Sequence, residues 1–110
     1  MRKGIVKYNN VVAGTITETN EGFYIFEYNE QYMQDFPDLF VTFQMPVRSQ
    51  PYRSTVLFPF FDGLIPEGWL LSIASESWKL NQNDRMGLLL ACCQNCIGAV
   101  SVHPLIVNRD

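Results

Sequence analysis

Few of the residues that usually mark a reaction centre occur in this sequence. Its 110 residues contain one histidine, and its seven glycines never form the G-x-G or G-x-x-x-x-G-K spacing of a phosphate-binding loop. That histidine, His103, precedes Pro104 in a β-prone run, and no recognised motif pairs it with a serine or an acid. Asp62 and Glu67 are a conceivable carboxylate pair, although a turn and a helix start explain them more simply. We therefore predict no catalytic residues and no enzymatic activity for this chain.

Cysteine is also sparse. Cys92, Cys93 and Cys96 lie close together without a distant partner, and their odd number does not suit a disulfide framework. Such a cluster fits a reducing compartment. A structural zinc site needs four ligands, and His103 is the single histidine that is able to complete Cys93-x-x-Cys96. We therefore predict neither a metal nor a cofactor, and we interpret these cysteines as small core residues.

Long hydrophobic runs and a secretion signal are missing as well. No apolar run approaches the roughly 20 residues that a membrane span requires, and the start, MRKGIVKYNN, has no continuous apolar segment. Hydrophobic residues nevertheless make up 47% of the chain and charged residues 17%, a composition typical of globular proteins. We expect one cytoplasmic domain that spans residues 1–110.

Positive charge is absent from one long stretch of a chain whose net charge is −3. No lysine or arginine occurs between Lys7 and Arg48. Six acidic residues fall in the same interval: Glu18, Glu21, Glu27, Glu30, Asp35 and Asp38. A phosphate backbone would repel this half of the chain, which argues against direct nucleic-acid binding. Two interpretations stay open, namely a solvated sheet face and a surface that steers towards a basic partner.

The first half of the chain predicts an antiparallel meander. Short runs rich in β-branched and aromatic residues are separated by Asn9-Asn10 and by the turn at residues 20–22. The predicted strands cover residues 5–8, 11–19, 23–28 and 39–45. Residues 46–51 are polar and loop-like. Residues 54–66 are apolar but interrupted by prolines, which predicts a packed, irregular connection.

The second half predicts two short helices, at residues 66–80 and 85–93, and a closing strand at residues 99–105. Residues 81–84 offer a turn and an N-cap between the helices. A buried face follows from the i, i+3, i+4, i+7 spacing of Met86, Leu89, Leu90 and Cys93. The predicted fold class is therefore α+β, a small antiparallel sheet with two short helices and a C-terminal strand.

The two tryptophans take unequal positions on the first of these helices. At about 100° per residue, one broad apolar face is formed by Leu70, Leu71, Ile73, Ala74 and Trp78. Trp69 falls at the border of this face, beside Ser72 and Glu76. It is therefore either a core-edge residue or an anchor for a protein partner, because tryptophan is enriched among interface hot spots.

Three runs in the second half resemble a known family. FFDGLIPEGWLL, then DRMGLLLACCQ, then IGAVSV are similar in order and spacing to the N-terminal subdomain of HipA-type kinases, and VAGTI at residues 12–16 fits the opening meander of that subdomain. The matching residues are Phe60, Phe61, Leu64, Pro66, Glu67, Gly68, Leu88, Leu89, Gly98, Ala99 and Val100. The resemblance covers nearly the whole chain and implies the fold of that subdomain.

The resemblance also implies a function. In the family, this subdomain packs on a kinase core that carries the phosphoryl-transfer residues, and this sequence ends where that core begins. A freestanding version is similar to HipS, the antitoxin of HipBST toxin–antitoxin systems, which binds and neutralises the separate serine/threonine kinase HipT. HipB, the DNA-binding third component, is then a partner through the complex. The alternative is a scaffold or N-terminal fragment that supports a HipA-like kinase instead of inhibiting it.

The predicted contact with the kinase is the segment that leads from the phenylalanine-rich run into the first predicted helix. It begins in the phenylalanine-rich run and ends at the border tryptophan. The predicted partner-binding residues are Phe61, Asp62, Ile65, Pro66, Glu67, Gly68 and Trp69.

Overall fold

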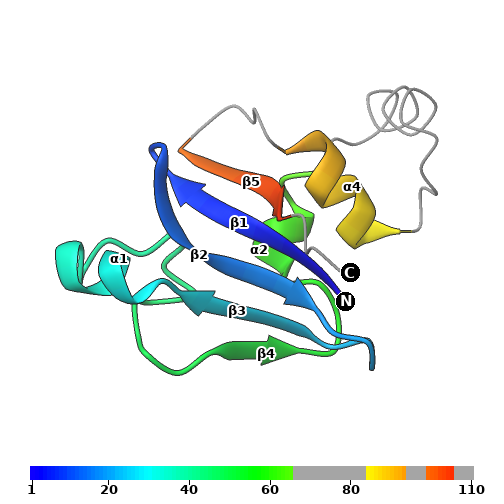
Figure 1. Cartoon of the computed structure of the whole chain (residues 1–110), viewed down its shortest axis with the longest axis horizontal. Helices are drawn as coiled ribbons and strands as arrows, with labels where there is room; N and C mark the ends of the chain where they lie inside the picture. The colour runs from blue at the N-terminus through cyan, green and yellow to red at the C-terminus, as the bar shows by residue number, and fades with distance from the viewer. Residues whose placement is uncertain (66–83, 94–98, 106–110) are drawn as a thin grey trace.

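A five-stranded antiparallel sheet with the strand order β4-β3-β2-β1-β5 forms the centre of the molecule (Figure 1). The computed structural model describes residues 1–65, 84–93 and 99–105. The strands are β1 (Arg2–Tyr8), β2 (Val11–Glu18), β3 (Tyr24–Tyr28), β4 (Tyr52–Ser54) and β5 (Val100–Leu105), and the helices are α1 (Glu30–Asp35), α2 (Pro59–Asp62) and α4 (Arg85–Cys92). The α+β class, the opening meander and the closing strand are thus confirmed.

The β1–β2 hairpin is fixed by its two asparagines. Asn9 and Asn10 have φ angles of 51° and 69°, the left-handed pair that a tight turn between twisted strands requires. Asparagine tolerates this conformation better than most residues do. The Asn9 N–H donates to the Ala99 carbonyl at 2.8 Å, so the same turn is tied to the residue that precedes β5.

One face of the sheet forms the core. Alternate residues of neighbouring strands, among them Val6, Ile16, Phe26 and Val102, are fully buried on it. Gly14 also lies on this face, where a Cβ atom would stand 2.3 Å from the Glu27 carbonyl oxygen. Two strand backbones therefore approach closely at this point, which explains why glycine occupies it.

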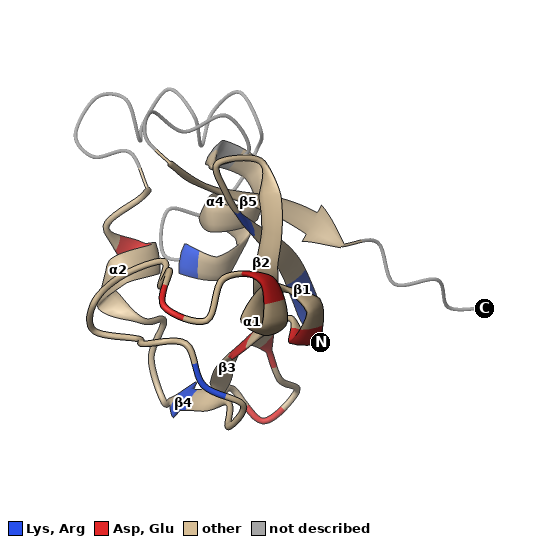
Figure 2. Cartoon of the chain, turned by 90° about the vertical axis from the view of Figure 1, so that its left-hand side faces the viewer, with Lys and Arg blue, Asp and Glu red and all other residues tan. Residues whose placement is uncertain are grey.

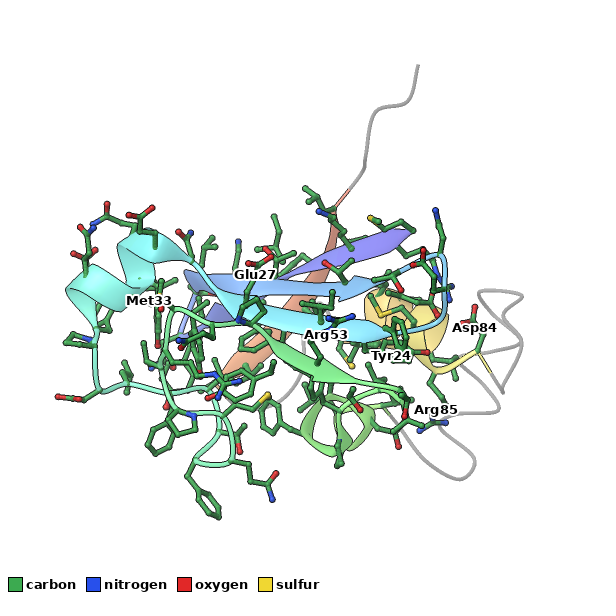
Figure 3. The ribbon with its side chains drawn as sticks, turned by 90° about the horizontal axis from the view of Figure 1, so that it is seen from below. Tyr24, Glu27, Met33, Arg53, Asp84 and Arg85 are labelled. Carbon is green, nitrogen blue, oxygen red and sulfur yellow. The ribbon has the colours of Figure 1, made fainter. Side chains whose placement is uncertain are left out.

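Both α2 and α4 pack on this core face. In Figure 3, α2 lies below the sheet and α4 beside it. The Phe61 ring of α2 lies 5.4 Å from the Phe26 ring, between centroids. Met86, Leu88 and Leu89 of α4 are fully buried. The second helix predicted from the sequence is confirmed as α4, and none of the helices in the described ranges is long and apolar enough to cross a membrane.

The outer edge of β5 is covered by the residue that ends α4. The Val102 N–H points away from β1 and donates to the Cys93 carbonyl at 2.9 Å. Cys93 is buried, and its thiol donates to the Leu64 carbonyl at 3.3 Å. The packing role predicted for this cysteine therefore comes with a hydrogen bond that joins α4 to the turn after α2.

Residues 39–45 were the clear error of the strand prediction. They form an irregular loop with a single isolated bridge between Thr42 and Met45, and the fourth strand is β4, at residues 52–54. The reason is competition for backbone groups. Tyrosine side chains from β3 and α1 bond to Leu39, Val41 and Met45, which diverts the loop from a ladder.

The sequence prediction also missed α1. Asn29 caps this helix, because its side chain accepts a hydrogen bond from the Gln31 N–H at 3.1 Å. Tyr32 is the buried residue of the helix, and Pro37 follows its C-cap. An asparagine cap, an acid in the first turn and a following proline were the local signals of a helix here.

Candidate functional site

Two ionic contacts fix the residues on either side of the segment 66–83. On one side, Asp62 of α2 accepts a hydrogen bond from Nε of Arg85, with 2.6 Å between nitrogen and oxygen. On the other side, the Arg2 guanidinium donates to both carboxylate oxygens of Asp84, each at 2.8 Å. Figure 3 shows Asp84 and Arg85 together at the start of α4. The chain therefore leaves and re-enters the core at two anchored points.

The Arg2 contact extends across the sheet. Its Nε donates to Glu18 at 2.7 Å, and the Tyr24 hydroxyl donates to the other oxygen of Glu18 at 3.2 Å. Hydrogen bonding to Asp84 raises the pKa of Arg2, and the same bond lowers the pKa of Asp84. Both side chains are charged at neutral pH, so their bidentate ion pair joins β1 to the start of α4, and the contact of Arg2 with Glu18 joins β1 to β2.

Asp84 has a second role as the N-cap of α4. Its Oδ1 accepts a hydrogen bond from the Gly87 N–H at 3.2 Å, as the predicted capping residue should. A Cβ atom on Gly87 would lie 2.4 Å from Oδ2 of Asp84, so glycine here leaves room for the carboxylate. Cap and ion pair therefore use the same side chain, and the start of α4 depends on it twice.

We expect the Asp84→Asn variant to lower the free energy of unfolding by about 1 kcal/mol near neutral pH, because it removes the charge of a partly exposed ion pair but keeps a capping oxygen. Since the folded-state pKa of Asp84 is depressed, the advantage of the wild type is complete above the ordinary carboxyl pKa and is lost as the pH falls through the folded value. Urea unfolding between about pH 7 and about pH 2.5 measures this difference.

The Asp84→Ala variant separates the two roles. It also removes the cap, and we expect a further loss of about 1 kcal/mol that persists at low pH. An Asp84→Asn variant as stable as the wild type at every pH would contradict a stabilising ion pair at this position.

The predicted contact residues are distributed between the core and the surface. Phe61 is fully buried and Ile65 nearly so, whereas Asp62 is partly exposed. Residues 66–69, which include Trp69, lie outside the described residues, as does the whole of the first predicted helix. Asp62 is therefore the one residue, among the described predicted contact residues, that reaches solvent.

A surface hollow of about 530 Å³ adjoins Asp62. Its lining side chains come from four parts of the chain and include Tyr24, Val56, Leu57, Pro59, Asp62 and Arg85. Val56 is 63% exposed beside it. Sequence reasoning did not single out Val56 or Arg85. Asp62 and Arg85 are 23 residues apart in the sequence, and no local spacing rule predicts a contact at that separation.

The described ranges offer few residues for metal binding or acid–base catalysis. No group of three His, Cys, Asp or Glu side chains there is placed to hold a metal ion. His103 lies on β5, where Ser101 Oγ is 2.9 Å from its Nε2. Desolvation, and to a smaller extent the charge of Lys7, lowers the pKa of His103.

Comparison with known proteins agrees with this architecture. The model of the HipA N-terminal domain family matches residues 4–103. The solved N-terminal domain of HipA toxin superposes with a TM-score of 0.73 at 26% identity, covering 98% of this chain and 96% of that one.

Two curated relatives show the same domain in different settings. An uncharacterised protein of Haemophilus influenzae is 32% identical over 103 residues, which are 94% of this chain and 92% of that protein. A Sinorhizobium fredii protein named "Putative kinase Y4dM" is 32% identical over 99 aligned positions, and the match covers 84% of this chain but 24% of the longer protein. The chain belongs to the HipA N-terminal domain family.

Proposed function

We propose that this chain is an antitoxin of the HipS type, which binds a separate HipA-like serine/threonine kinase, HipT, and inhibits it. The observation that carries the proposal is the small Haemophilus relative, because the same domain makes up 92% of that protein and 24% of the kinase-named relative. A domain that occurs in both settings has a surface suited to contact with a kinase core. In a separate chain, that surface is available to a partner.

The anchored frame around residues 66–83 supports the location of the contact. Asp62 and Arg85 tie α2 to the start of α4, and Arg2 ties Asp84 to the sheet. A contact segment that begins and ends on such anchors loses less conformational entropy on binding than a free loop does. A domain of this size also offers the roughly 800 Å² per partner of a standard interface.

The contact explains inhibition in either of two ways. The segment enters the nucleotide or substrate cleft of the kinase, or it holds the kinase lobes in one arrangement. Insertion into the nucleotide cleft makes inhibition competitive with ATP, whereas locking of the lobes leaves it insensitive to ATP. A DNA-binding protein of the HipB type is then associated through the kinase complex.

The alternative is a scaffold that supports the kinase. It is favoured by the two Sinorhizobium fredii relatives, "Putative kinase Y4dM" and "Putative kinase Y4mE", in which the domain is part of a longer chain. Both functions are binding functions, and they differ in the sign of the effect on phosphate transfer.

Adding the purified chain to the HipT kinase and following phosphate transfer from ATP distinguishes these functions. We expect transfer to fall to background once the chain is equimolar with the kinase. A rise in transfer would favour the scaffold instead. An unchanged rate, together with no binding by calorimetry, would contradict both. A reaction with this chain and ATP alone tests for activity of its own, which we expect to be absent.

A further inference from the structure

The loop between α1 and β4 displays large apolar side chains to solvent. We call residues 36–47 the aromatic loop. Phe43 is 74% exposed, Phe40 41% and Leu39 39%. Phe43 stands at the tip of a tight turn that is closed by a hydrogen bond from the Met45 N–H to the Thr42 carbonyl at 2.9 Å. Three large apolar side chains are thus exposed within five consecutive residues.

Buried tyrosines hold this loop in place. The Tyr28 hydroxyl accepts a hydrogen bond from the Val41 N–H at 3.1 Å and donates one to the Met45 carbonyl. Tyr32 donates to the Leu39 carbonyl at 2.6 Å. Burial raises the pKa of Tyr28 to about 12, so its hydroxyl keeps its proton at neutral pH.

The loop is also anchored by its own side chains. Val41 and Met45 are buried in the core, whereas Phe43 between them points outward. A fixed backbone with an exposed aromatic tip is the arrangement expected of a preformed contact, since little entropy is lost when a partner covers it. Scattered exposed residues on an otherwise unconstrained loop would not have this property.

The charges around the loop are mainly negative. Asp35 directly precedes the loop and Asp38 lies near its N-terminal end, and both are exposed, as is Glu30 at the start of α1. Figure 2, in which α1 faces the viewer, shows the acidic positions there and the basic positions of β4 and the residues before it. The nearest of these, Arg48, lies over the Tyr52 ring at 3.7 Å and donates to carbonyls of its own segment.

This charge selects among possible occupants. Two copies of the loop would bring Asp35 and Asp38 against each other, and nucleic acid or an anionic membrane would be repelled. A protein surface with an apolar hollow bordered by lysine or arginine complements both the aromatic tip and the acidic flank. The observations therefore favour a basic protein partner.

The loop shares a face of the molecule with α2. Tyr28 holds the loop, and Phe26 packs on Phe61 of α2. These two residues are two positions apart in β3, so their side chains lie on the same side of the strand. Figure 3 shows the segment between α1 and β4 on the side of the sheet where α2 lies. One partner is therefore able to contact the α2 region and the aromatic loop together.

We propose that the aromatic loop is a second kinase-binding surface, in which Phe43, Phe40 and Leu39 enter an apolar hollow of the kinase that is bordered by basic residues. The proposal rests on the proposed function, because the kinase is the partner. This surface is a contact in addition to the segment at residues 61–69. The acidic residues Glu30, Asp35 and Asp38 then attract the basic surface of the kinase and speed association.

The test compares binding of HipT by the wild type and by Phe43→Ser, using calorimetry and surface plasmon resonance. We expect Phe43→Ser to weaken binding at least about tenfold through faster dissociation, without a change in its unfolding midpoint. An Asp35→Asn, Asp38→Asn double variant should slow association and reduce its salt dependence.

Two leucines of equal exposure provide the matched control. Leu39 and Leu105 are both 39% exposed, but Leu105 lies on β5, on the opposite face of the sheet. Leu39→Ser should weaken binding and Leu105→Ser should not. Equal effects of the two substitutions, or normal affinity of Phe43→Ser, would overturn the second surface while leaving the proposed function intact.

A wild-type chain that fails to bind the kinase would overturn the proposed function itself. Sedimentation of the chain alone tests the other possible occupant of the loop, which is a second copy of the chain. We expect a monomer for both the wild type and Phe43→Ser. A wild-type dimer that Phe43→Ser dissociates would show that the loop binds a second copy, which would also overturn the proposal.

Discussion

Replacing Phe61 by alanine is expected to lower the free energy of unfolding by about 3–5 kcal/mol. Its ring is fully buried and lies 5.4 Å from the Phe26 ring, 5.2 Å from the Phe60 ring and 6.2 Å from the Phe58 ring, between centroids. Truncation removes the contacts of α2 with the sheet and leaves a cavity that the surrounding rings fill only in part. Urea unfolding followed by far-ultraviolet circular dichroism measures the loss.

The expected loss is a large fraction of the stability of a small domain, so Phe61→Ala will leave part of the population unfolded in buffer. Phe61→Leu keeps most of the volume and should cost less, which makes it measurable if the alanine variant does not fold. Phe43→Ala is the matched control, because the same truncation at an exposed ring should change stability by no more than about 0.5 kcal/mol. A Phe61→Ala variant as stable as this control would contradict a core role.

Replacing Trp69 by alanine is expected to weaken binding to HipT by roughly 30- to 1,000-fold, which corresponds to about 2–4 kcal/mol. The residue lies outside the described part of the chain, so the prediction rests on the sequence. A helix from Pro66 places Trp69 at the border of its apolar face, beside Glu76. A large side chain at such a border is able to contact a partner without leaving a gap in the core.

The second tryptophan supplies the control for this prediction. Trp78 falls within the predicted apolar face, so Trp78→Ala should lower the unfolding midpoint, whereas Trp69→Ala should preserve it and lose affinity. Calorimetric titration and thermal unfolding of both variants give the comparison. If Trp69→Ala is the variant that unfolds, Trp69 belongs to the core, and if it binds normally, the anchor of the interface lies elsewhere.

The elements that could be predicted are those that local rules specify. The Asn9-Asn10 turn needs two left-handed residues, and asparagine supplies them. α4 begins at an aspartate cap and buries Met86, Leu89 and Cys93 at the predicted spacing, although Leu90 of the predicted face is only partly buried and Leu88 is fully buried instead. Such signals lie within a few residues of the structure that they specify, and a single sequence is enough to read them.

The error at residues 39–45 comes from contacts between residues that are separated in the sequence, whereas α1 was missed despite its local signals. Residues 39–45 have strand composition, but tyrosines 7 to 17 positions away take the backbone groups that a strand would need. For the candidate site, Asp62 and the segment beside it were predicted from the sequence as contact residues. Its partner Arg85 and the Arg2–Asp84 bond, which spans 82 positions, have no local signature.

The covered edge of β5 has a consequence for how copies of this chain behave at high concentration. Val102 directs its N–H outward to Cys93, and Pro104, two positions further along the same edge, has no N–H to offer. An incoming strand therefore meets a donor that is already engaged and then a proline ring, two of the devices by which natural sheets resist edge-to-edge aggregation. Growth of cross-β fibrils from the β5 side of the sheet is therefore disfavoured.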